Sequence, residues 1–230
     1  MKKLIIGTLV ALSATSVLAQ EKTNLYLKTG VDISSKYSST ELQGGKVNGG
    51  KTKNSGTEFV VEATRFVTPS FELGAGVGYQ IHGKPDKASS VIEKNGMNKG
   101  DKLTVENTSY RSIPLYITGK YNFSYGNIKP YIKSDLGYSF NFNNKDLKYK
   151  LKSHDENKNP SNDNGKVHTN VENGLYFGIG TGIEYNNFVV ELSYKINKAK
   201  MTYNEKHLGK YKKKYDYSRT TLSVGYKFDI

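Results

Sequence analysis

The feature that most constrains this chain is a period-two alternation of apolar and polar residues in eight separate stretches. In the clearest stretch, at 71–82, apolar residues at odd positions alternate with Glu, Gly, Gln and His at even positions. Successive side chains of a β-strand point to opposite faces, so each stretch predicts a strand with one apolar face. The strands are expected near 25–34, 58–67, 71–82, 112–123, 129–142, 172–185, 188–196 and 219–230.

The connections between these stretches alternate in length. Three are tight turns, at 68–70, 124–127 and 186–187, and four are long polar loops, at about 37–55, 83–107, 143–170 and 197–216. Long loops at one end and short turns at the other are typical of a barrel that spans the bacterial outer membrane, with both termini periplasmic. A soluble sandwich or lipocalin-type barrel has no reason to segregate its loops so strictly. We therefore predict an all-β fold, an eight-stranded antiparallel transmembrane β-barrel whose first and last strands pair.

The N-terminus carries the features of an export signal. Lys2 and Lys3 precede an apolar run at 4–12, and Val17, Leu18 and Ala19 form a small-residue cleavage pattern. We expect a cleaved signal peptide at 1–19 and one barrel domain at 20–230. No later segment approaches the roughly 20 apolar residues of a membrane helix, and the mean hydropathy is −0.62. The chain has no cysteine, which excludes disulfides, thiolate chemistry and a lipoprotein anchor.

The charge on the expected polar faces is nearly balanced, with eight acids against seven bases, whereas the four long loops together carry +10. An eight-stranded barrel has a lumen just wide enough for side chains to fill it, so charges inside must pair. Glycines on the polar faces are expected to make room for long charged side chains. The residues expected in a lumen ionic network are Glu62, Glu72, Lys120, Lys133, Asp135, Glu172, Glu184, Glu191, Lys195 and Arg219.

Three residues do not fit the simple alternation. Pro114 lies inside the fourth strand and lacks a backbone N–H, so we expect a bulge or a water there. Arg65 and Arg111 fall on the apolar rows, but each lies near a strand end, where its side chain can reach a lipid headgroup.

The fourth long loop combines basic and aromatic residues, a composition that can bind sulfated or phosphorylated polyanions. The alternative is a solvated loop, or one that rests on the phosphates of neighbouring lipopolysaccharide. The candidate residues are Lys206, Lys210, Lys212, Lys213, Lys214, Tyr211 and Tyr215.

Catalytic and metal motifs are weak. His154, His168 and His207 lie in long loops, and only His82 lies on a polar strand face, without a recognisable serine partner in sequence. We therefore predict no enzymatic activity, no metal and no cofactor. Nucleic acid is not an expected partner of an exported barrel.

Several motifs resemble a known family. They are Ile113-Pro114-Leu115-Tyr116, Lys129-Pro130-Tyr131 and Gly180-Thr181-Gly182-Ile183. Together they resemble the small-barrel superfamily of OmpA-like transmembrane domains and opacity-type surface proteins. Relatives of the opacity type use their loops as adhesins.

The end of the chain carries a further resemblance. Residues 223–230 are similar to the terminal strand signal that the barrel-assembly machinery recognises, although Ile replaces the usual terminal Phe. This resemblance implies outer-membrane localisation and a role in assembly for Ser223, Gly225, Tyr226, Phe228 and Ile230.

Three functions remain open from the sequence. The first is a structural or adhesin-like surface barrel whose loops contact lipopolysaccharide or host polyanions. The second is a small porin-like channel, which would need a water-filled lumen. The third is a lipid-modifying enzyme, which would need His82 beside a serine and an acid at the outer face of the membrane.

Overall fold

A computed structural model describes residues 23–38, 40–42, 45–47, 50–85, 88–91, 102–106, 108–123, 127–142, 147–152, 163–205 and 209–230. The expected signal peptide and its cleavage site lie outside these residues. Within the described ranges, no helix has the length and hydropathy needed to cross a bilayer.

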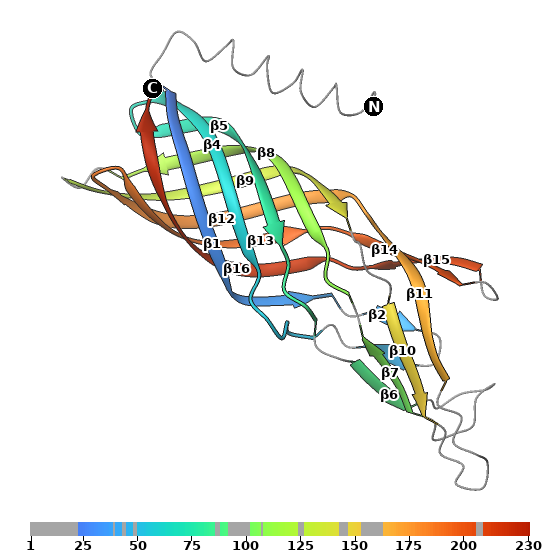
Figure 1. Ribbon diagram of the computed structural model, residues 1–230. Coiled ribbons are helices and arrows are strands. Elements are labelled where there is room, and N and C mark those ends of the chain that lie inside the picture. The colour runs from blue at the N-terminus through green and yellow to red at the C-terminus, as the bar shows by residue number, and fades with distance from the viewer. Residues whose placement is uncertain are drawn as a thin grey trace, which may run out of the picture.

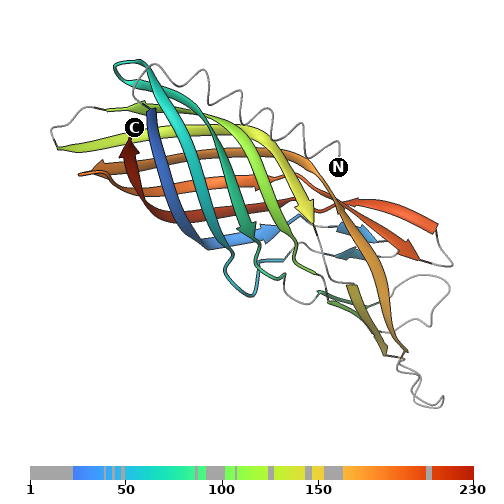
Figure 2. The ribbon, with the colours of Figure 1, turned by 45° about the horizontal axis from the view of Figure 1, so that its top comes forward.

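Eight strands close into an antiparallel barrel in the order β1-β16-β13-β12-β9-β8-β5-β4. Figures 1 and 2 show the strands tilted around one axis, with the C-terminus at one end. Because β1 pairs with β16 from Asn24–Asp229 to Tyr37–Tyr217, the predicted eight-stranded closed barrel is confirmed. The barrel strands are β1 (Thr23–Tyr37), β4 (Thr57–Thr68), β5 (Phe71–Ile81), β8 (Arg111–Asn122), β9 (Ile128–Phe142), β12 (Gly174–Tyr185), β13 (Phe188–Asn197) and β16 (Tyr217–Asp229).

The alternation in sequence becomes two faces of the wall. Apolar side chains of all eight strands are exposed on the outside, among them Leu115, Ile132 and Ile179. The inward side chains are mostly polar or charged and are buried, for example Glu62 and Lys133. A surface of this kind is stable only where lipid replaces water on the outside and polar groups pair with one another inside.

The strand connections at the end near the C-terminus are tight. Asn186 and Asn187 have φ angles of 47° and 67°, so they form the two-residue β12–β13 turn that matches the twist of an antiparallel pair. At the 68–70 turn, the Phe71 amide donates to the Thr68 hydroxyl at 3.1 Å.

The bulge expected at Pro114 is absent. Pro114 pairs with Ser139 of β9 without a register shift. The β5–β8 ladder stops at Val77–Leu115 and resumes at Gln80–Ser112 in the same register. The strand therefore accommodates the missing N–H by a gap in the ladder on one side. Irregularities lie elsewhere, between Asp32 and Ser34 of β1 and between Phe66 and Thr68 of β4.

The four long segments that were expected to be loops contain β-strands. A six-stranded sheet in the order β15-β14-β11-β10-β7-β6 extends beyond the end of the barrel opposite the C-terminus, and β2 pairs with β3 in a short hairpin (Figure 1). These strands are β2 (Thr40–Leu42), β3 (Gly45–Val47), β6 (Ala88–Val91), β7 (Lys102–Glu106), β10 (Leu147–Lys152), β11 (Asp163–Glu172), β14 (Lys200–Glu205) and β15 (Gly209–Lys214). We call the six-stranded sheet the outer sheet, because it lies on the side of the long connections.

An aromatic cap lies between the barrel lumen and the outer sheet. We define it by the buried cluster Tyr37, Tyr110, Val171, Ala199, Met201, Tyr215 and Tyr217. The Tyr37 and Tyr215 rings stack with centroids 4.6 Å apart, and Tyr217 packs on Tyr37 at 4.9 Å. Because residues from five separate chain segments meet here, the cap ties the outer sheet to the barrel.

Candidate functional site

The lumen is filled by three layers of ion pairs, of which the first lies near the short turns. Lys120 bonds to Glu184 and lies 3.3 Å from Glu72. The Tyr26 hydroxyl donates to Glu184 at 2.9 Å and accepts from Lys120 at 2.8 Å. Lys227 adds a second cation 3.7 Å from Glu184. This layer therefore holds two bases and two acids.

The middle layer has an excess of acid. Lys28 lies 2.8 Å from both Glu62 and Glu191, and Lys133 lies 2.5 Å from Glu62 and 3.3 Å from Asp135. Two bases thus face three carboxyl groups, all five side chains at most 5% exposed. A layer of this kind tolerates no further loss of positive charge, because an unpaired buried charge costs several kcal/mol.

The outer layer is balanced again. Arg219 donates to Glu58 at 3.0 Å and lies 3.4 Å from Asp32, while Lys195 bonds to Glu58. The three layers together keep the single excess negative charge that the sequence count predicts for the polar faces. Lys129, one of the seven bases in that count, is exposed instead of inside the lumen. Glu172, one of the eight acids, lies outside the barrel wall, so the difference between acids and bases is unchanged.

Tyrosines share the lumen with these charges. Tyr116 donates to Glu62 at 2.7 Å, and Tyr131 donates to Glu191 at 3.0 Å. Inward glycines make room for the two rings: a Cβ at Gly76 would lie 2.6 Å from the Tyr116 ring, and a Cβ at Gly182 would lie 2.5 Å from Tyr131. At these two positions the sequence interpretation was wrong, because glycine accommodates aromatic rings where long charged side chains were expected.

The free space in the middle of the lumen is very small. A cavity lined by Lys28, Glu62, Lys120, Lys133 and Glu191, among others, has a volume of about 10 Å³. One water needs about 10–15 Å³ measured in this way, so the layer has room for a single water at most. The charged and aromatic side chains around this cavity thus fill most of the lumen at this level.

The outer end of the lumen brings His82 next to a serine that the sequence motifs did not identify. His82 Nε2 lies 2.7 Å from Ser112 Oγ, and Ser112 donates to Gln80 at 2.9 Å. Ser112 is 0% exposed, and the other ring nitrogen of His82 has no hydrogen-bond partner among the described groups. A nucleophilic serine needs access to substrate and a carboxylate behind the histidine. Among the described residues, this pair has neither.

The candidate polyanion-binding residues separate in the structure. Lys212 and Lys214 are exposed and Lys213 is half-buried. Tyr215 is 2% exposed and donates to the Thr108 carbonyl at 2.9 Å. Its proposed place on a binding surface was therefore wrong, since it packs in the aromatic cap. Lys206 and the side chains of Lys210 and Tyr211 lie outside the described part of the chain.

Glu172 is also corrected by the structure. It was expected in the lumen, but it lies in β11 of the outer sheet, where its carboxylate is 2.6 Å from Lys212. The hydrogen bond from Lys212 lowers the pKa of Glu172. Lys214 similarly lies 3.4 Å from Asp216. The exposed lysines of β15 are thus partly neutralised by neighbouring acids. The other predicted lumen residues all lie in the three ion-pair layers.

The residues of the expected assembly signal close the barrel. Ser223 is buried, and Gly225 pairs with Lys28 of β1. Tyr226 and Phe228 are exposed on the outer face with ring centroids 4.9 Å apart. Ile230 and Thr23 exchange two backbone hydrogen bonds, of 2.8 and 2.9 Å. The last residues of the chain therefore complete the seam between the first and last strands.

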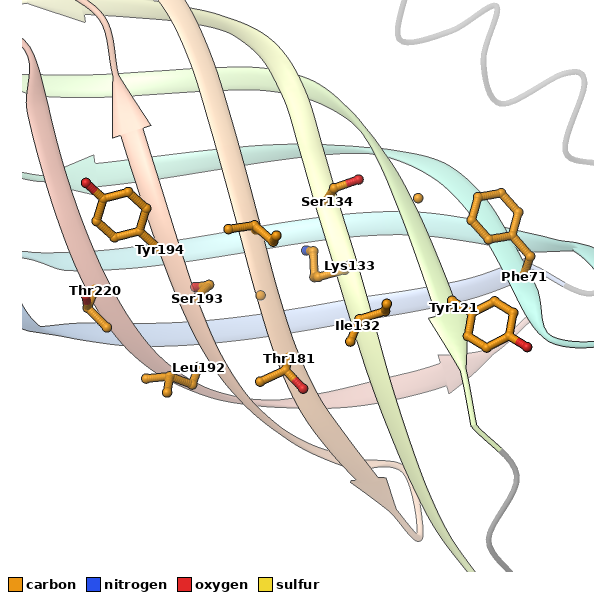
Figure 3. Close-up of a pocket in the computed structure, with 13 residues that line it drawn as sticks. Phe71, Tyr121, Ile132, Lys133, Ser134, Thr181, Leu192, Ser193, Tyr194 and Thr220 are labelled. Carbon is orange, nitrogen blue, oxygen red and sulfur yellow. The ribbon is translucent and has the colours of Figure 1, made fainter.

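The outer face of the wall carries a shallow groove of about 560 Å³. Figure 3 shows Thr181 there, between the larger side chains of Ile132 and Leu192. The groove lies on the apolar face of β8, β9, β12 and β13, so lipid chains are its expected surroundings.

Comparison with known proteins agrees with this geometry. The sequence profile of the outer membrane protein beta-barrel domain matches residues 6–228, nearly the whole chain. The chain belongs to this family. This outer-membrane β-barrel is 32% identical over 237 residues to the uncharacterized protein PM1543 of Pasteurella multocida strain Pm70, a match that covers 99% of this chain and 98% of the relative.

Solved structures show the same fold. Outer membrane protein OprG from Pseudomonas aeruginosa is 15% identical, with a TM-score of 0.51 over 91% of this chain and 96% of OprG. Outer membrane protein AlkL in lipid bilayers is 12% identical, with a TM-score of 0.50 over 92% of each chain. At these identities the similarity concerns the fold alone. The predicted resemblance to small outer-membrane barrels is confirmed, and the family and fold support an outer-membrane location.

Proposed function

We propose that this outer-membrane β-barrel is a non-enzymatic, non-conducting surface protein whose barrel anchors the outer sheet above the membrane, where its basic strands contact polyanions. The observation that carries the proposal is the filled lumen. Three layers of paired charges leave about 10 Å³ of free space at its middle. A barrel closed in this way supports an anchor and opposes the porin-like alternative.

The outer sheet is the part of the molecule that meets the surroundings of the cell. The exposed Lys212 and Lys214 follow the half-buried Lys213, and Lys200 pairs with Lys214 across the β14–β15 ladder. Glu172 and Asp216 neutralise Lys212 and Lys214 only in part, so an anionic ligand beside these lysines and Lys200 is stabilising. The ligand class proposed here is a sulfated or phosphorylated glycan, in lipopolysaccharide or on a host cell.

The burial of Ser112 opposes the lipid-modifying alternative. A lipid substrate would have to reach a hydroxyl that is 0% exposed and surrounded by Gln80, Asn197 and His82. Substrate access there would require displacement of the aromatic cap or of the barrel wall.

Conductance is the direct test of the closed lumen. Refolded full-length barrel in a planar bilayer is expected to give no sustained openings at voltages that leave the membrane intact, because the middle layer holds at most one water. A well-characterised porin refolded in the same lipid serves as the positive control. Reproducible single-channel steps from the purified barrel would contradict the closed lumen and support the porin-like channel instead.

Polyanion binding is tested by replacing the three lysines of β15 whose side chains the structure describes. The variant Lys212→Gln, Lys213→Gln, Lys214→Gln should bind immobilised heparin about tenfold more weakly at low salt, since each exposed ion pair contributes about 0.5 kcal/mol. Binding by the unmodified protein should fall with salt, because exposed charges are screened beyond about 8 Å at physiological ionic strength. Barrel stability should change by less than about 0.5 kcal/mol.

The matched control removes the same charge elsewhere. The variant Lys36→Gln, Lys51→Gln, Lys53→Gln changes three exposed lysines outside the outer sheet. Equal weakening by the two triple variants would mean that heparin responds to net charge alone, and the β15 surface would lose its proposed role.

A further inference from the structure

His82 is a buried histidine between the barrel and the aromatic cap. It directly follows β5 and is 3% exposed. Its ring packs against the rings of Tyr110 and Tyr217, at centroid distances of 4.3 and 4.2 Å, and its backbone amide donates to the Tyr110 carbonyl at 3.3 Å. Tyr110 and Tyr217 both belong to the cap. The cap therefore packs directly on this polar side chain.

The residue after His82 binds the cap to the end of the barrel. The Gly83 carbonyl accepts from the Tyr37 hydroxyl at 3.0 Å, and the Gly83 amide donates to the Tyr217 hydroxyl at 3.1 Å. The Tyr217 hydroxyl in turn donates to Asp32 at 2.7 Å. Because His82 and Gly83 are adjacent in the chain, displacement of the His82 ring disturbs all three hydrogen bonds.

The hydrogen bonds of His82 fit a neutral ring. Ser112 donates its one hydrogen to Gln80 at 2.9 Å, so His82 Nε2 is the donor in its 2.7 Å contact with the Ser112 hydroxyl. Nδ1 of the neutral ring then carries no proton, and it has no hydrogen-bond partner among the described groups. A second proton on Nδ1 would be a buried, charged N–H without an acceptor, which is strongly unfavourable.

The charged groups that face His82 also disfavour a positive ring. They are Asp32, Glu58, Lys195 and Arg219 of the outer ion-pair layer, and Lys84 and Arg111, which line the same cavity of about 250 Å³ at the barrel rim. Bases outnumber acids here, and both acids are already paired with the bases of their own layer. Burial and the positive charge of Arg219 hold the pKa of His82 well below its ordinary value.

We propose that the aromatic cap is an acid-sensitive latch, in which protonation of His82 separates the cap and the attached outer sheet from the closed barrel. The proton comes from the solvent and binds to Nδ1. In the open latch the charged ring is in contact with water, so both ring nitrogens can donate hydrogen bonds. The ion-pair layers of the lumen need no rearrangement for this step.

The direction of the pH effect follows from the lowered pKa of His82. In the open latch the ring is hydrated and has the ordinary histidine pKa of about 6.5. The closed latch binds fewer protons than the open one, so its stability is complete above about pH 6.5 and falls as the pH decreases below that value. Between about pH 7.5 and about pH 5, the open fraction should rise about 30-fold.

Hydrogen exchange of the refolded full-length barrel in detergent micelles tests the latch. Exchange of the cap amides, such as that of Tyr215, which donates to the Ala199 carbonyl at 2.8 Å, is followed by mass spectrometry at the two pH values. After correction for the intrinsic pH dependence of exchange, it should rise about 30-fold on acidification. Amides of the barrel strands β9 and β12 should keep their protection.

Two variants of His82 remove the titrating group. His82→Phe keeps an aromatic ring between Tyr110 and Tyr217, and His82→Gln keeps a side-chain N–H for Ser112. In both variants the corrected exchange of the cap should change by less than about twofold between the two pH values. The matched control replaces the other three histidines of the chain by Gln and should retain the full rise. These are His154, His168 and His207.

Three results would overturn the proposal. One is a corrected exchange of the cap that does not rise in the unmodified barrel, or that rises equally in the His82 variants. Another is loss of the rise in the control, which would assign it to a different histidine. The third is an equal rise in β9 and β12, which would mean that the whole barrel opens. Heparin binding takes no part in this test, so the latch and the proposed polyanion contacts stand or fail separately.

Discussion

Removal of Phe228, Asp229 and Ile230 is expected to abolish formation of a stable barrel. These residues pair with the start of β1, Phe228 with Leu25 and Asp229 with Asn24, and Ile230 exchanges two hydrogen bonds with Thr23. Without them, one end of the seam exposes unpaired backbone groups to lipid, each at a cost of several kcal/mol. Heat-modifiable mobility of the protein refolded into lipid vesicles measures the outcome, and the truncated chain should give no folded band.

Two full-length variants separate the backbone from the side chains. Ile230→Phe restores the usual terminal aromatic residue and should fold as the unmodified chain does. Alanine at both 228 and 230 keeps the ladder and removes the exposed Phe228 and Ile230 side chains. That variant should fold from denaturant into vesicles but give a lower yield in cells if the assembly machinery recognises the terminal side chains, as the resemblance of residues 223–230 implies. Wild-type yield of the truncated chain would contradict the role of the seam.

Replacement of Lys133 by methionine is expected to lower the free energy of unfolding by about 3–5 kcal/mol. Lys133 is one of two bases in the middle layer, at 2.5 Å from Glu62 and 3.3 Å from Asp135. Its loss leaves Lys28 alone with three buried carboxyl groups. Equilibrium unfolding by urea in lipid vesicles, monitored by tyrosine fluorescence, measures the difference.

The same strand offers a matched control. Lys129→Met makes the identical change four residues earlier at an exposed position, and should alter stability by less than about 0.5 kcal/mol. Lys133→Met combined with Glu62→Gln restores the original excess of one acid and should recover part of the loss. The paired layer would be ruled out as a source of stability if Lys133→Met and Lys129→Met unfolded alike.

The positions of these charged side chains explain how the lumen of the barrel is closed. Some of the lumen ion pairs join strands that are not neighbours: Lys28 of β1 meets Glu191 of β13, and Lys120 of β8 meets Glu184 of β12. Ion pairs of this kind cross the barrel and resist its opening. The aromatic cap then separates the ion-pair layers from the outer sheet.

The strands, their faces and the closure of the barrel could be predicted from the sequence, because lipid outside and a narrow polar lumen inside impose a strict period of two. The paired asparagines of the β12–β13 turn and the terminal pattern at 223–230 are local signals of the same kind. The outer sheet could not be predicted in this way. Its strands are only 4 to 10 residues long and come from segments far apart in the sequence, so an alternation such as that of Leu147, Tyr149 and Leu151 with lysines does not specify a partner strand.

The site depended more strongly on tertiary structure. Which base meets which acid is set by the stagger of strands around the barrel, whereas only the overall balance of acids and bases could be predicted from the sequence. Tyr215 directly follows the lysines of β15, yet it is buried because the rings of Tyr37 and Tyr110, from distant parts of the chain, lie 4.6 and 6.1 Å from its own. The contact between His82 and Ser112, 30 residues apart, likewise arises only when β5 and β8 pair. The sequence thus determined the barrel and the sides of its wall, whereas long-range packing decided which polar groups inside the barrel pair with one another.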